Sequence, residues 1–313
     1  MKKDKKLDTE TLGGRLKGLE AAYETSVESS KHIIVRCDGH KFSNFTKGFN
    51  KPFDEILSKA MELTTMDLVE EFNAATGYCQ SDEITLIIPS YEDNTVDNRE
   101  STKHKLHKCV RENWNHAFSG RVQKMASLIA GFTTMKFNKH LKVLVEKEFE
   151  QFQDAQLYEI VMDKEYNYLI DIISKKVGNA WFDARVYGVG SDAEAFNSVL
   201  WRIRDAEKNS RSMFAQAYCS HKQLQKMTGK EQVEFCKAET GEDWEQVADR
   251  YKYGILVKKE NYMKRLDSYD RAIAQSYGDG PGPKEVQRSR LTSWAQHMVF
   301  SDENVDLIMR KVK

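Results

Sequence analysis

Apolar positions in the first part of the chain change between strand-like runs and helical spacing. The β-branched run at 32–37 predicts a buried strand, and apolar residues three and four apart over 53–76 predict a helix. Two further strands are expected at about 77–80 and 84–88. Ser81-Asp82-Glu83 joins them, and Ser and Asp favour tight turns because their side chains bond nearby backbone amides. The pattern therefore predicts a strand, a helix and a hairpin, in that order.

The later pattern adds a second helix and a fourth strand. Residues 102–134 have largely helical spacing, 181–187 is expected to be a strand, and a long amphipathic helix is expected over 192–220. The order strand, helix, strand, strand, helix, strand is that of the ferredoxin-like split βαβ unit. We expect an α/β protein of the α+β type, with a four-stranded antiparallel βαββαβ sheet and helices on one face. Residues 1–220 would form this main domain, and 221–313 a mainly helical C-terminal region.

Charge and composition exclude several classes of protein. The 313 residues carry 48 Lys+Arg and 48 Asp+Glu, so net charge gives no argument for nucleic-acid binding, although a local basic groove stays possible. No apolar run approaches the roughly 20 residues that cross a bilayer, and no apolar segment follows the basic N-terminus, so neither a membrane span nor a secretory signal is expected. Five scattered cysteines without a C-x-x-C pair favour a reduced, cytoplasmic protein without structural zinc.

Three acidic residues lie where the predicted strands meet. Asp38 follows the first strand, and Asp82 and Glu83 lie in the hairpin turn. In a βαββαβ sheet the first strand lies beside the third, so these ends are expected to come together. Neighbouring carboxylates repel one another unless a cation intervenes, and two Mg²⁺ ions would suit the oxygen ligands and a phosphoryl transfer. From spacing alone, a loop cap at Asp38 and an ordinary hairpin turn explain the same residues.

A glycine-led loop follows the first predicted strand. A loop of this kind can turn its backbone N–H groups toward phosphate oxygens. A glycine turn with solvated side chains is an equally good interpretation, and the chain contains no Walker motif. The residues of this candidate nucleotide-binding loop are Asp38, Gly39, His40, Lys41, Phe42 and Ser43.

Two sets of polar residues on the predicted helices are further candidates. Arg121 and Lys124 lie one turn apart and share a helix face, so they could hold a triphosphate, although such basic pairs are usually solvated. On the helix at 192–220, a polar stripe runs beside the apolar face and either lines a cleft or borders solvent. This stripe consists of Arg202, Asp205, Asn209, Ser212 and Gln216.

Together, these motifs closely resemble those of the tRNA-histidine guanylyltransferase superfamily. The resemblance extends over roughly residues 10–255, and its motifs fall in family order, whereas an insertion near 91–115 and the end of the chain are less similar. The matching segments are 36–47 (Arg-Cys-Asp-Gly-His-Lys-Phe-Ser-Asn-Phe-Thr-Lys), 51–54 (Lys-Pro-Phe-Asp), 77–83 (Gly-Tyr-Cys-Gln-Ser-Asp-Glu), 182–186 (Phe-Asp-Ala-Arg-Val) and 201–210 (Trp-Arg-Ile-Arg-Asp-Ala-Glu-Lys-Asn-Ser).

The resemblance implies a polymerase-palm-like catalytic domain that adds nucleotides in the 3′-to-5′ direction to the 5′ end of tRNA. By matching position, Asp38, the Gly39 carbonyl and Asp82 would bind two Mg²⁺ ions, and Glu83 would be the adjacent acid. GTP or other NTPs and ATP would be substrates, tRNA the partner, and the assembly a homotetramer. The implied nucleotide-binding residues are Asp38, Gly39, His40, Lys41, Phe42, Ser43, Ser81, Asp82, Arg121, Lys124 and Asn209.

One motif departs from the eukaryotic members of the superfamily. Those that act on tRNA-His carry His-Ile-Asn-Asn where this chain has Glu207, Lys208, Asn209 and Ser210, so that only Asn209 is kept. The variant resembles the repair branch, whose members restore missing 5′ nucleotides of truncated tRNAs by Watson–Crick templating. Template-dependent 5′-end repair is therefore the leading hypothesis, and addition of an extra 5′ guanosine to tRNA-His is the alternative.

Two other functions are compatible with the same residues. A palm-type nucleotide cyclase would use similar hairpin acids and make a cyclic product from NTP without RNA. A catalytically idle RNA-binding module would use the basic helices of the C-terminal part. The second idea is weakened because Asp38, Asp82 and Glu83 are all present.

Overall fold

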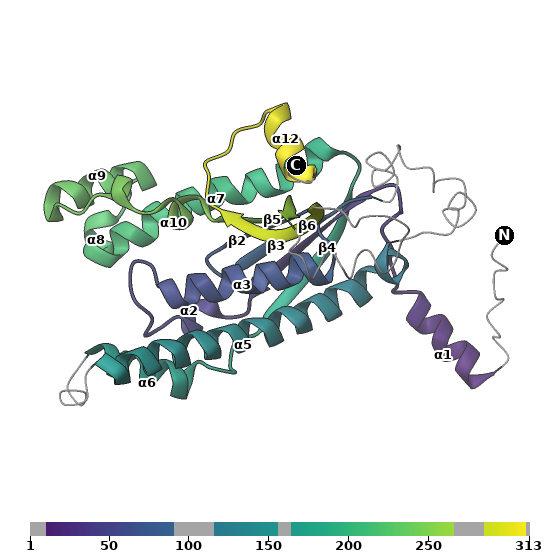
Figure 1. Ribbon diagram of the computed structural model, residues 1–313, viewed down its shortest axis with the longest axis horizontal. Coiled ribbons are helices and arrows are strands. Elements are labelled where there is room, and N and C mark those ends of the chain that lie inside the picture. Colours follow the sequence, from purple (N-terminus) through teal and green to yellow (C-terminus); the bar gives the residue numbers. More distant parts are fainter. Residues whose placement is uncertain (1–10, 91–115, 156–163, 266–284, 311–313) are drawn as a thin grey trace.

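The computed structural model describes residues 11–90, 116–155, 164–265 and 285–310 of the chain. Its centre is a six-stranded antiparallel sheet in the order β4-β1-β3-β2-β5-β6 (Figure 1). The first four strands have the expected split βαβ order, since β1 lies between β3 and β4. The strands are β1 (His32–Gly39), β2 (Thr76–Gln80), β3 (Glu83–Ile88), β4 (Phe182–Val189), β5 (Ile255–Arg265) and β6 (Glu285–Trp294).

Several helices begin at a residue whose side chain caps them. The side chain of Asp54 accepts a hydrogen bond from the Leu57 amide at the start of α3, and Ser191 accepts one from the Glu194 amide at the start of α7. The α-helices are α1 (Leu12–Ala21), α2 (Phe42–Phe45), α3 (Glu55–Glu71), α5 (Val122–Ala155), α6 (Lys164–Lys175), α7 (Asp192–Tyr218), α8 (His221–Leu224), α9 (Gly229–Thr240), α10 (Asp249–Tyr253) and α12 (Asp302–Met309). Two 3₁₀ helices span Ala117–Gly120 and Trp244–Gln246.

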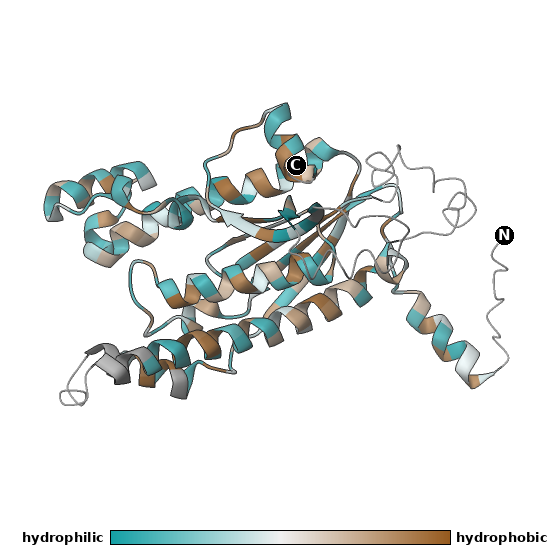
Figure 2. Ribbon diagram, viewed as in Figure 1, coloured by the Kyte–Doolittle hydropathy of each residue, from teal (hydrophilic) through white to brown (hydrophobic). Residues whose placement is uncertain are grey.

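Helices cover both faces of the sheet, which corrects the expectation of helices on one face. Along β1, Ile33 and Val35 belong to a core formed with α3 and α5, whereas Ile34 packs into a second core with α7 and α12. Because successive residues of a strand point to opposite faces, a fully apolar β1 can serve both cores. Figure 2 shows hydrophobic and hydrophilic residues alternating along α3 and α5, as expected of helices with one face on the sheet.

The sheet has two more strands than the four expected, because β5 pairs with β2 and β6 pairs with β5. These strands fall in the region that was expected to be mainly helical. Only the beginning of β5, at Ile255 to Lys258, is buried, and most of the rest is polar and increasingly exposed. Such a short apolar run does not distinguish a strand from a helix, so the pairing partner decides its conformation.

Other boundaries also differ from the sequence expectation. The helix expected over 102–134 begins at Val122 and continues to Ala155, and the insertion at 91–115 lies outside the described residues. The strand at 181–187 and the helix at 192–220 are confirmed as β4 and α7. Across the residues that the structure describes, no helix combines the length and apolar character needed to cross a membrane.

A third, smaller core lies at the C-terminal end of α7. Phe214 packs there with Cys236 of α9 and Trp244, and the Trp244 indole N–H donates a 3.0 Å hydrogen bond to the Ser210 hydroxyl. The expected boundary at residue 220 falls between α7 and α8. Since α7 contributes to the second and third cores, it connects the sheet to the helices that follow it.

Candidate active site

The pairing of β1 with β3 brings Asp38 and Asp82 to the same end of the sheet. Asp38 lies opposite Glu83, and the turn containing Asp82 directly precedes β3. The Gly39 amide donates a 3.0 Å hydrogen bond to the Asp82 carbonyl oxygen, which joins the end of β1 to this turn. Ser81 has a φ of 48°, which lies in the left-handed region that residues other than glycine rarely adopt. The expected meeting of the first strand and the hairpin is confirmed.

Electrostatics at this end favour a bound cation. Burial raises the pKa of Asp82, and the negative charge of Asp38 raises it further, while backbone and Ser81 hydrogen bonds oppose the shift. A cation between the two carboxylates would remove this repulsion and favour the ionised form of both. The pKa of Asp82 stays raised although the charge of Arg202 lowers it, so a bound cation would further stabilise the ionised carboxylate.

The donor atoms at this end are oxygens, the type that Mg²⁺ prefers. Asp38 and Asp82 offer carboxylates, and Gly39, which directly follows Asp38, offers its backbone carbonyl. Among the described residues, no three His, Cys, Asp or Glu side chains converge into a complete metal cage. Mg²⁺ usually takes only one or two carboxylates together with substrate phosphates, so two acids suit an ion that binds with a nucleotide.

Glu83 lies on the same face as Asp38 but is engaged in a buried ion pair. Its Oε1 accepts a hydrogen bond from Arg202 Nε on α7, and its Oε2 lies 3.9 Å from Arg36 Nε. Burial raises the pKa of Glu83, and Arg202 opposes this effect. Glu83 therefore ties β3 to α7 directly beneath the Asp38–Asp82 pair.

The loop after Asp38 is held by an aromatic anchor. Phe42 is buried, and its ring lies 5.1 Å from that of Phe182 on β4. A Cβ at Gly39 would lie only 2.2 Å from the Phe42 ring, so the close packing of this loop needs glycine there. His40, Lys41 and Ser43 are exposed, as residues that meet a ligand would be. Their role in nucleotide binding stays a prediction.

Two connected pockets open beside the carboxylates. The first has a volume of about 340 Å³ and a largely apolar lining that includes Leu57, Met61 and Cys79. The second, of about 390 Å³, is lined by Asp38, Asp82, Glu83 and Arg202. We call them the apolar pocket and the acidic pocket. Their shared lining residues are Gln80, Ser81, Asn209, Met213 and Gln216.

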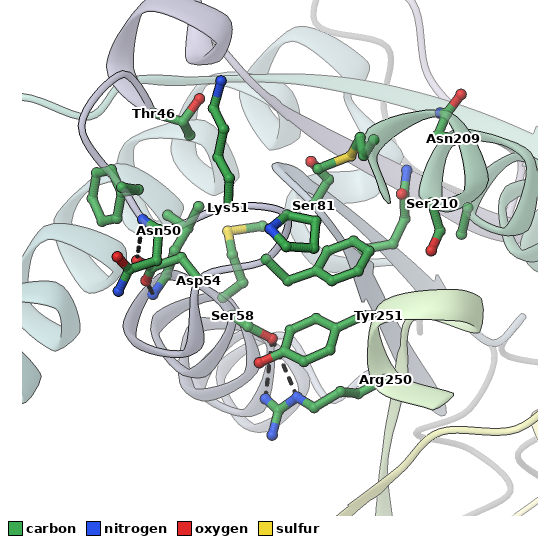
Figure 3. A pocket seen from close by; sticks show the side chains of 18 of the residues that line it. Thr46, Asn50, Lys51, Asp54, Ser58, Ser81, Asn209, Ser210, Arg250 and Tyr251 are labelled. Carbon is green, nitrogen blue, oxygen red and sulfur yellow. Dashed lines mark hydrogen bonds between the residues drawn. The ribbon is translucent and has the colours of Figure 1, made fainter. Parts of the chain in front are cut away.

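The walls of the apolar pocket come from distant parts of the chain (Figure 3). Asn50 and Asp54 lie on one side of it, and Asn209 and Ser210 of α7 lie on the other. Tyr251 of α10 stacks on Phe53 with the ring centroids 4.8 Å apart and the planes at 8°. Arg250 Nε and Nη2 donate hydrogen bonds of 3.3 and 3.1 Å to the Ser58 hydroxyl.

The polar stripe of α7 lines a cleft, which resolves the two interpretations that the sequence left open. Arg202, Asn209, Ser212 and Gln216 all border the acidic pocket. Asp205 lies one turn from Arg202 and forms an ion pair with it, with 3.1 Å between Arg202 Nη1 and Asp205 Oδ2. The stripe thus faces the carboxylates of β1 and the hairpin rather than open solvent.

Arg121 and Lys124 are not brought to these pockets within one chain. Arg121 pairs with Glu24 at 3.1 Å and forms a β-bridge with Ser26, before α5 begins. Thr134, further along α5, accepts a hydrogen bond from the amide of Phe182, the residue paired with Gly39. At about 1.5 Å per helical residue, Arg121 lies about 20 Å from that point.

Several residues near the site were not identified from the sequence. Asp183 lies directly opposite Asp38 on β4, and Arg185 Nη2 lies 3.7 Å from Asp38 Oδ2. Both belong to the matched segment at 182–186, but only the strand register reveals that they adjoin the carboxylates. Arg250 and Tyr251 carried no pattern that indicated a pocket, because their partners lie far away in the chain.

Comparison with known proteins supports the similarity already visible in the motifs. The family model described as tRNAHis guanylyltransferase matches residues 13–189, more than half of the chain. An uncharacterised protein of Acanthamoeba polyphaga mimivirus is 30% identical over 270 residues, covering 85% of this chain and 82% of that protein.

Two solved structures extend the similarity to the whole fold. A bacterial tRNA(His) guanylyltransferase-like protein in complex with ATP has a TM-score of 0.60 at 31% identity, covering 80% of this chain and 87% of that one. A bacterial protein of the same description in complex with GTP has a TM-score of 0.57 at 26% identity, covering 90% of each chain. The chain therefore belongs to the tRNA-His guanylyltransferase family of nucleotidyltransferases.

Proposed function

We propose that the protein adds nucleotides in the 3′-to-5′ direction to the 5′ end of tRNA and repairs truncated ends on the template of the opposite strand. The observation that carries this proposal is the position of Asp38 and Asp82 at an acidic pocket that opens into an apolar one. The apolar pocket has the size of a small-ligand site, and about 340 Å³ suits a nucleoside. ATP and GTP are bound in the two similar bacterial structures.

Each of the two pockets would hold a different part of an incoming nucleotide. The base would lie in the apolar pocket near Phe53 and Tyr251, and the triphosphate would extend past Ser81 and Asn209 into the acidic pocket. Backbone N–H groups at the start of α2 and the Ser43 hydroxyl would contact its phosphate oxygens. In this orientation the ribose, with its reacting 3′-hydroxyl, would lie near Ser81 and Asn209 where the two pockets meet, and Asp82 borders the acidic pocket there.

The reaction needs positioning and charge stabilisation rather than a protein nucleophile. A 5′-monophosphate is a poor electrophile, so ATP would first convert it to a 5′-adenylate with release of pyrophosphate, whereas a triphosphorylated end needs no activation. The 3′-hydroxyl of the incoming NTP then attacks the α-phosphorus of the 5′ end, and AMP or pyrophosphate leaves. Two Mg²⁺ ions held by Asp38, Asp82 and the Gly39 carbonyl would acidify that hydroxyl and neutralise phosphoryl charge.

The departure at Glu207 favours repair over guanosine addition to tRNA-His. Glu207 forms an ion pair with Arg211 one turn later on α7, and the Arg211 guanidinium lies 4.7 Å from the centre of the Trp244 ring. An engaged carboxylate cannot make the contact of a stacking or cationic imidazole, so base pairing with the template would select each nucleotide. Measuring kcat/KM for a truncated tRNA and for intact tRNA-His with all four NTPs tests this choice. Strong untemplated guanosine addition to intact tRNA-His would contradict it.

Arg121 and Lys124 keep their proposed role as triphosphate ligands only if the site is shared between copies of the chain. Arg121 lies about 20 Å and Lys124 about 15 Å along α5 from Thr134, which contacts the strand beside Gly39, and the proposed assembly is a homotetramer. Mixing the inactive Asp38→Asn and Arg121→Ala variants should then restore part of the activity. No restoration in a mixture that forms a tetramer would contradict a shared site.

The assay for the main proposal combines protein, Mg²⁺, labelled NTP and a 5′-truncated tRNA. Elongated RNA supports the proposal, a cyclic nucleotide formed without RNA would indicate a cyclase, and a gel shift alone would indicate an RNA-binding module. Asp38→Asn and Asp82→Asn should each abolish elongation without unfolding the protein, because each removes a charge but little volume. Asp306→Asn, on the exposed surface of α12, is the matched control. Near-wild-type rates for either site variant in saturating Mg²⁺ would refute the assignment.

A further inference from the structure

The exposed face of β4 carries an alternating row of aromatic and charged side chains. We call this row the β4 stripe, and it consists of Trp181, Asp183, Arg185 and Tyr187. Trp181, which directly precedes the strand, is 67% exposed, and Tyr187 is 39% exposed. The intervening Phe182 and Val186 are buried. Since β4 is the outermost strand at one edge of the described sheet, the stripe borders solvent.

The stripe lies on the same face of the sheet as the active-site carboxylates. Asp183 is paired with Asp38, and Arg185 is paired with Arg36. Directly opposed residues of antiparallel strands project to the same face, and like charges in such positions repel each other. The Arg36 guanidinium lies 5.3 Å from the centre of the Trp201 ring. Because Trp201 belongs to α7, this is the face of the sheet that α7 covers. The acids near these arginines lie at 3.7 Å or more, so a further anion between the two guanidinium groups would relieve their repulsion.

The two guanidinium groups have donors that the described residues do not use. Arg36 Nε is buried and makes no hydrogen bond there, and its nearest acid, Glu83, is already bonded to Arg202. Arg185 lies 3.7 Å from Asp38 and 3.8 Å from Asp183, and its side chain is 55% exposed. Such long, solvated contacts contribute little to stability. Arg185 can therefore donate hydrogen bonds to a phosphate group without losing a strong partner, and the positive charge of Arg36 would attract the same group.

The position of the stripe separates it from the nucleotide pockets. Neither pocket includes a β4 residue in its lining. The acidic pocket extends from Asp38 toward the hairpin and α7, and the apolar pocket continues beyond the residues that the two share. The stripe lies on the opposite side of Asp38. A nucleotide in the pockets would thus leave this side of the carboxylates open to the second substrate.

We propose that the β4 stripe binds the 5′-terminal nucleotides of the RNA acceptor, with Arg185 and Arg36 holding the first internucleotide phosphate and Trp181 and Tyr187 stacking on bases. This inference rests on the proposed function and adds the site of the second substrate to it. Aromatic side chains close to a positive charge are a common means of binding single-stranded or frayed nucleic acid, since every base has a stacking face. A protein partner is disfavoured because the opposed arginines call for a compact anion placed next to Asp38.

The test measures RNA binding without catalysis. Fluorescence anisotropy of a 5′-phosphorylated RNA hairpin with a truncated acceptor end is recorded at several salt concentrations for Arg185→Gln, Arg185→Lys and Trp181→Ala. Arg185→Gln should weaken binding about tenfold or more and lower the slope of log K against log[salt] by about one. Trp181→Ala should weaken binding at least about fivefold. Arg185→Lys should restore part of the affinity, and in each variant the loss of RNA affinity should exceed any rise in KM for NTP.

Arg290→Gln is the matched control. Arg290 is a similarly exposed arginine on β6, at the other edge of the sheet, and it lies over the ring of Tyr262 on β5. Unchanged RNA affinity in Arg185→Gln and Trp181→Ala would overturn the inference. A raised KM for NTP with unchanged RNA affinity would also overturn it and assign the stripe to the nucleotide. A smaller assembly for Trp181→Ala in sedimentation, again with unchanged RNA affinity, would identify an interface between copies. If the wild type binds the hairpin through the stripe but never elongates it, the proposed function fails while this inference stands.

Discussion

Replacing Arg202 by methionine should destabilise the protein strongly and in a pH-dependent way. The Arg202 and Glu83 side chains are only 9% and 8% exposed, so the variant leaves a buried carboxylate without its main partner. Breaking such a pair costs about 3–5 kcal/mol, and because Arg36 remains 3.9 Å from Glu83, we expect roughly 3 kcal/mol at pH 7.5.

The pH dependence follows from the direction of the Glu83 titration. Burial already raises the pKa of Glu83 and Arg202 opposes this, so removing Arg202 raises that pKa further. An unfolded glutamate titrates near 4.3, so between that value and the raised pKa the folded variant binds more protons than the unfolded chain. Stability of the variant therefore falls as the pH rises through this window. The loss relative to wild type should be smaller at pH 5.5 than at pH 7.5.

Urea denaturation followed by circular dichroism at both pH values measures the effect. Arg204→Met is the matched control, because Arg204 is an exposed arginine two residues further along the same helix. This substitution should lower stability only slightly. The double variant Arg202→Met/Glu83→Gln should recover much of the lost stability, since no unpaired charge is left. An equal loss at both pH values, or a loss as large for Arg204→Met, would refute the reasoning.

Three further outcomes are expected. Gly39→Ala should lower nucleotide addition at least about tenfold, because its Cβ would meet the packed Phe42 ring at 2.2 Å and displace the loop, whereas Gly190→Ala, with nothing within 4 Å, should have no effect. Tyr251→Ala should raise KM for the nucleotide about two- to tenfold in steady-state kinetics, since it removes one side of the aromatic stack at the pocket. Lys258→Met should abolish a rise in stability between about pH 7 and 10, measured by urea denaturation. Burial lowers the pKa of Lys258 from 10.5 to about 7, so in that window the unfolded chain binds more protons and wild-type stability increases with pH.

The position of the central acids could be predicted because it depends on local pattern and one topological rule. Apolar periodicity located β1, α3 and the hairpin, and the βαββαβ order placed the first strand beside the third. Asp38 and Asp82 then had to meet at one end of the sheet, as the register of β1 against β3 confirms. The polar stripe of α7 was visible in the same way, since helical spacing alone identifies which residues share a face.

Other features depend on which segments pair across the fold. The strands β5 and β6 are mostly polar, so their conformation comes from pairing with β2 and with each other. Glu83 follows Asp82 directly and looks equivalent to it in the sequence, but only the structure shows it bonded to Arg202 of α7. Tyr251 borders the pocket because α10 packs against β2 and α7, which no local pattern encodes.

The sequence by itself therefore determined the order of elements and the end of the sheet where the acidic residues lie. Hydrophobic periodicity is a local property, and the handedness and adjacency rules of split βαβ units extend it to the first four strands. Tertiary structure alone decided the partners of the charged side chains: Arg185 beside Asp38, Arg202 beneath Glu83, and Arg121 far from both. Helical spacing shows which face a charged residue shares but not its ion-pair partner, because that partner depends on distances of a few ångströms that arise only when strands and helices from separate parts of the chain pack together.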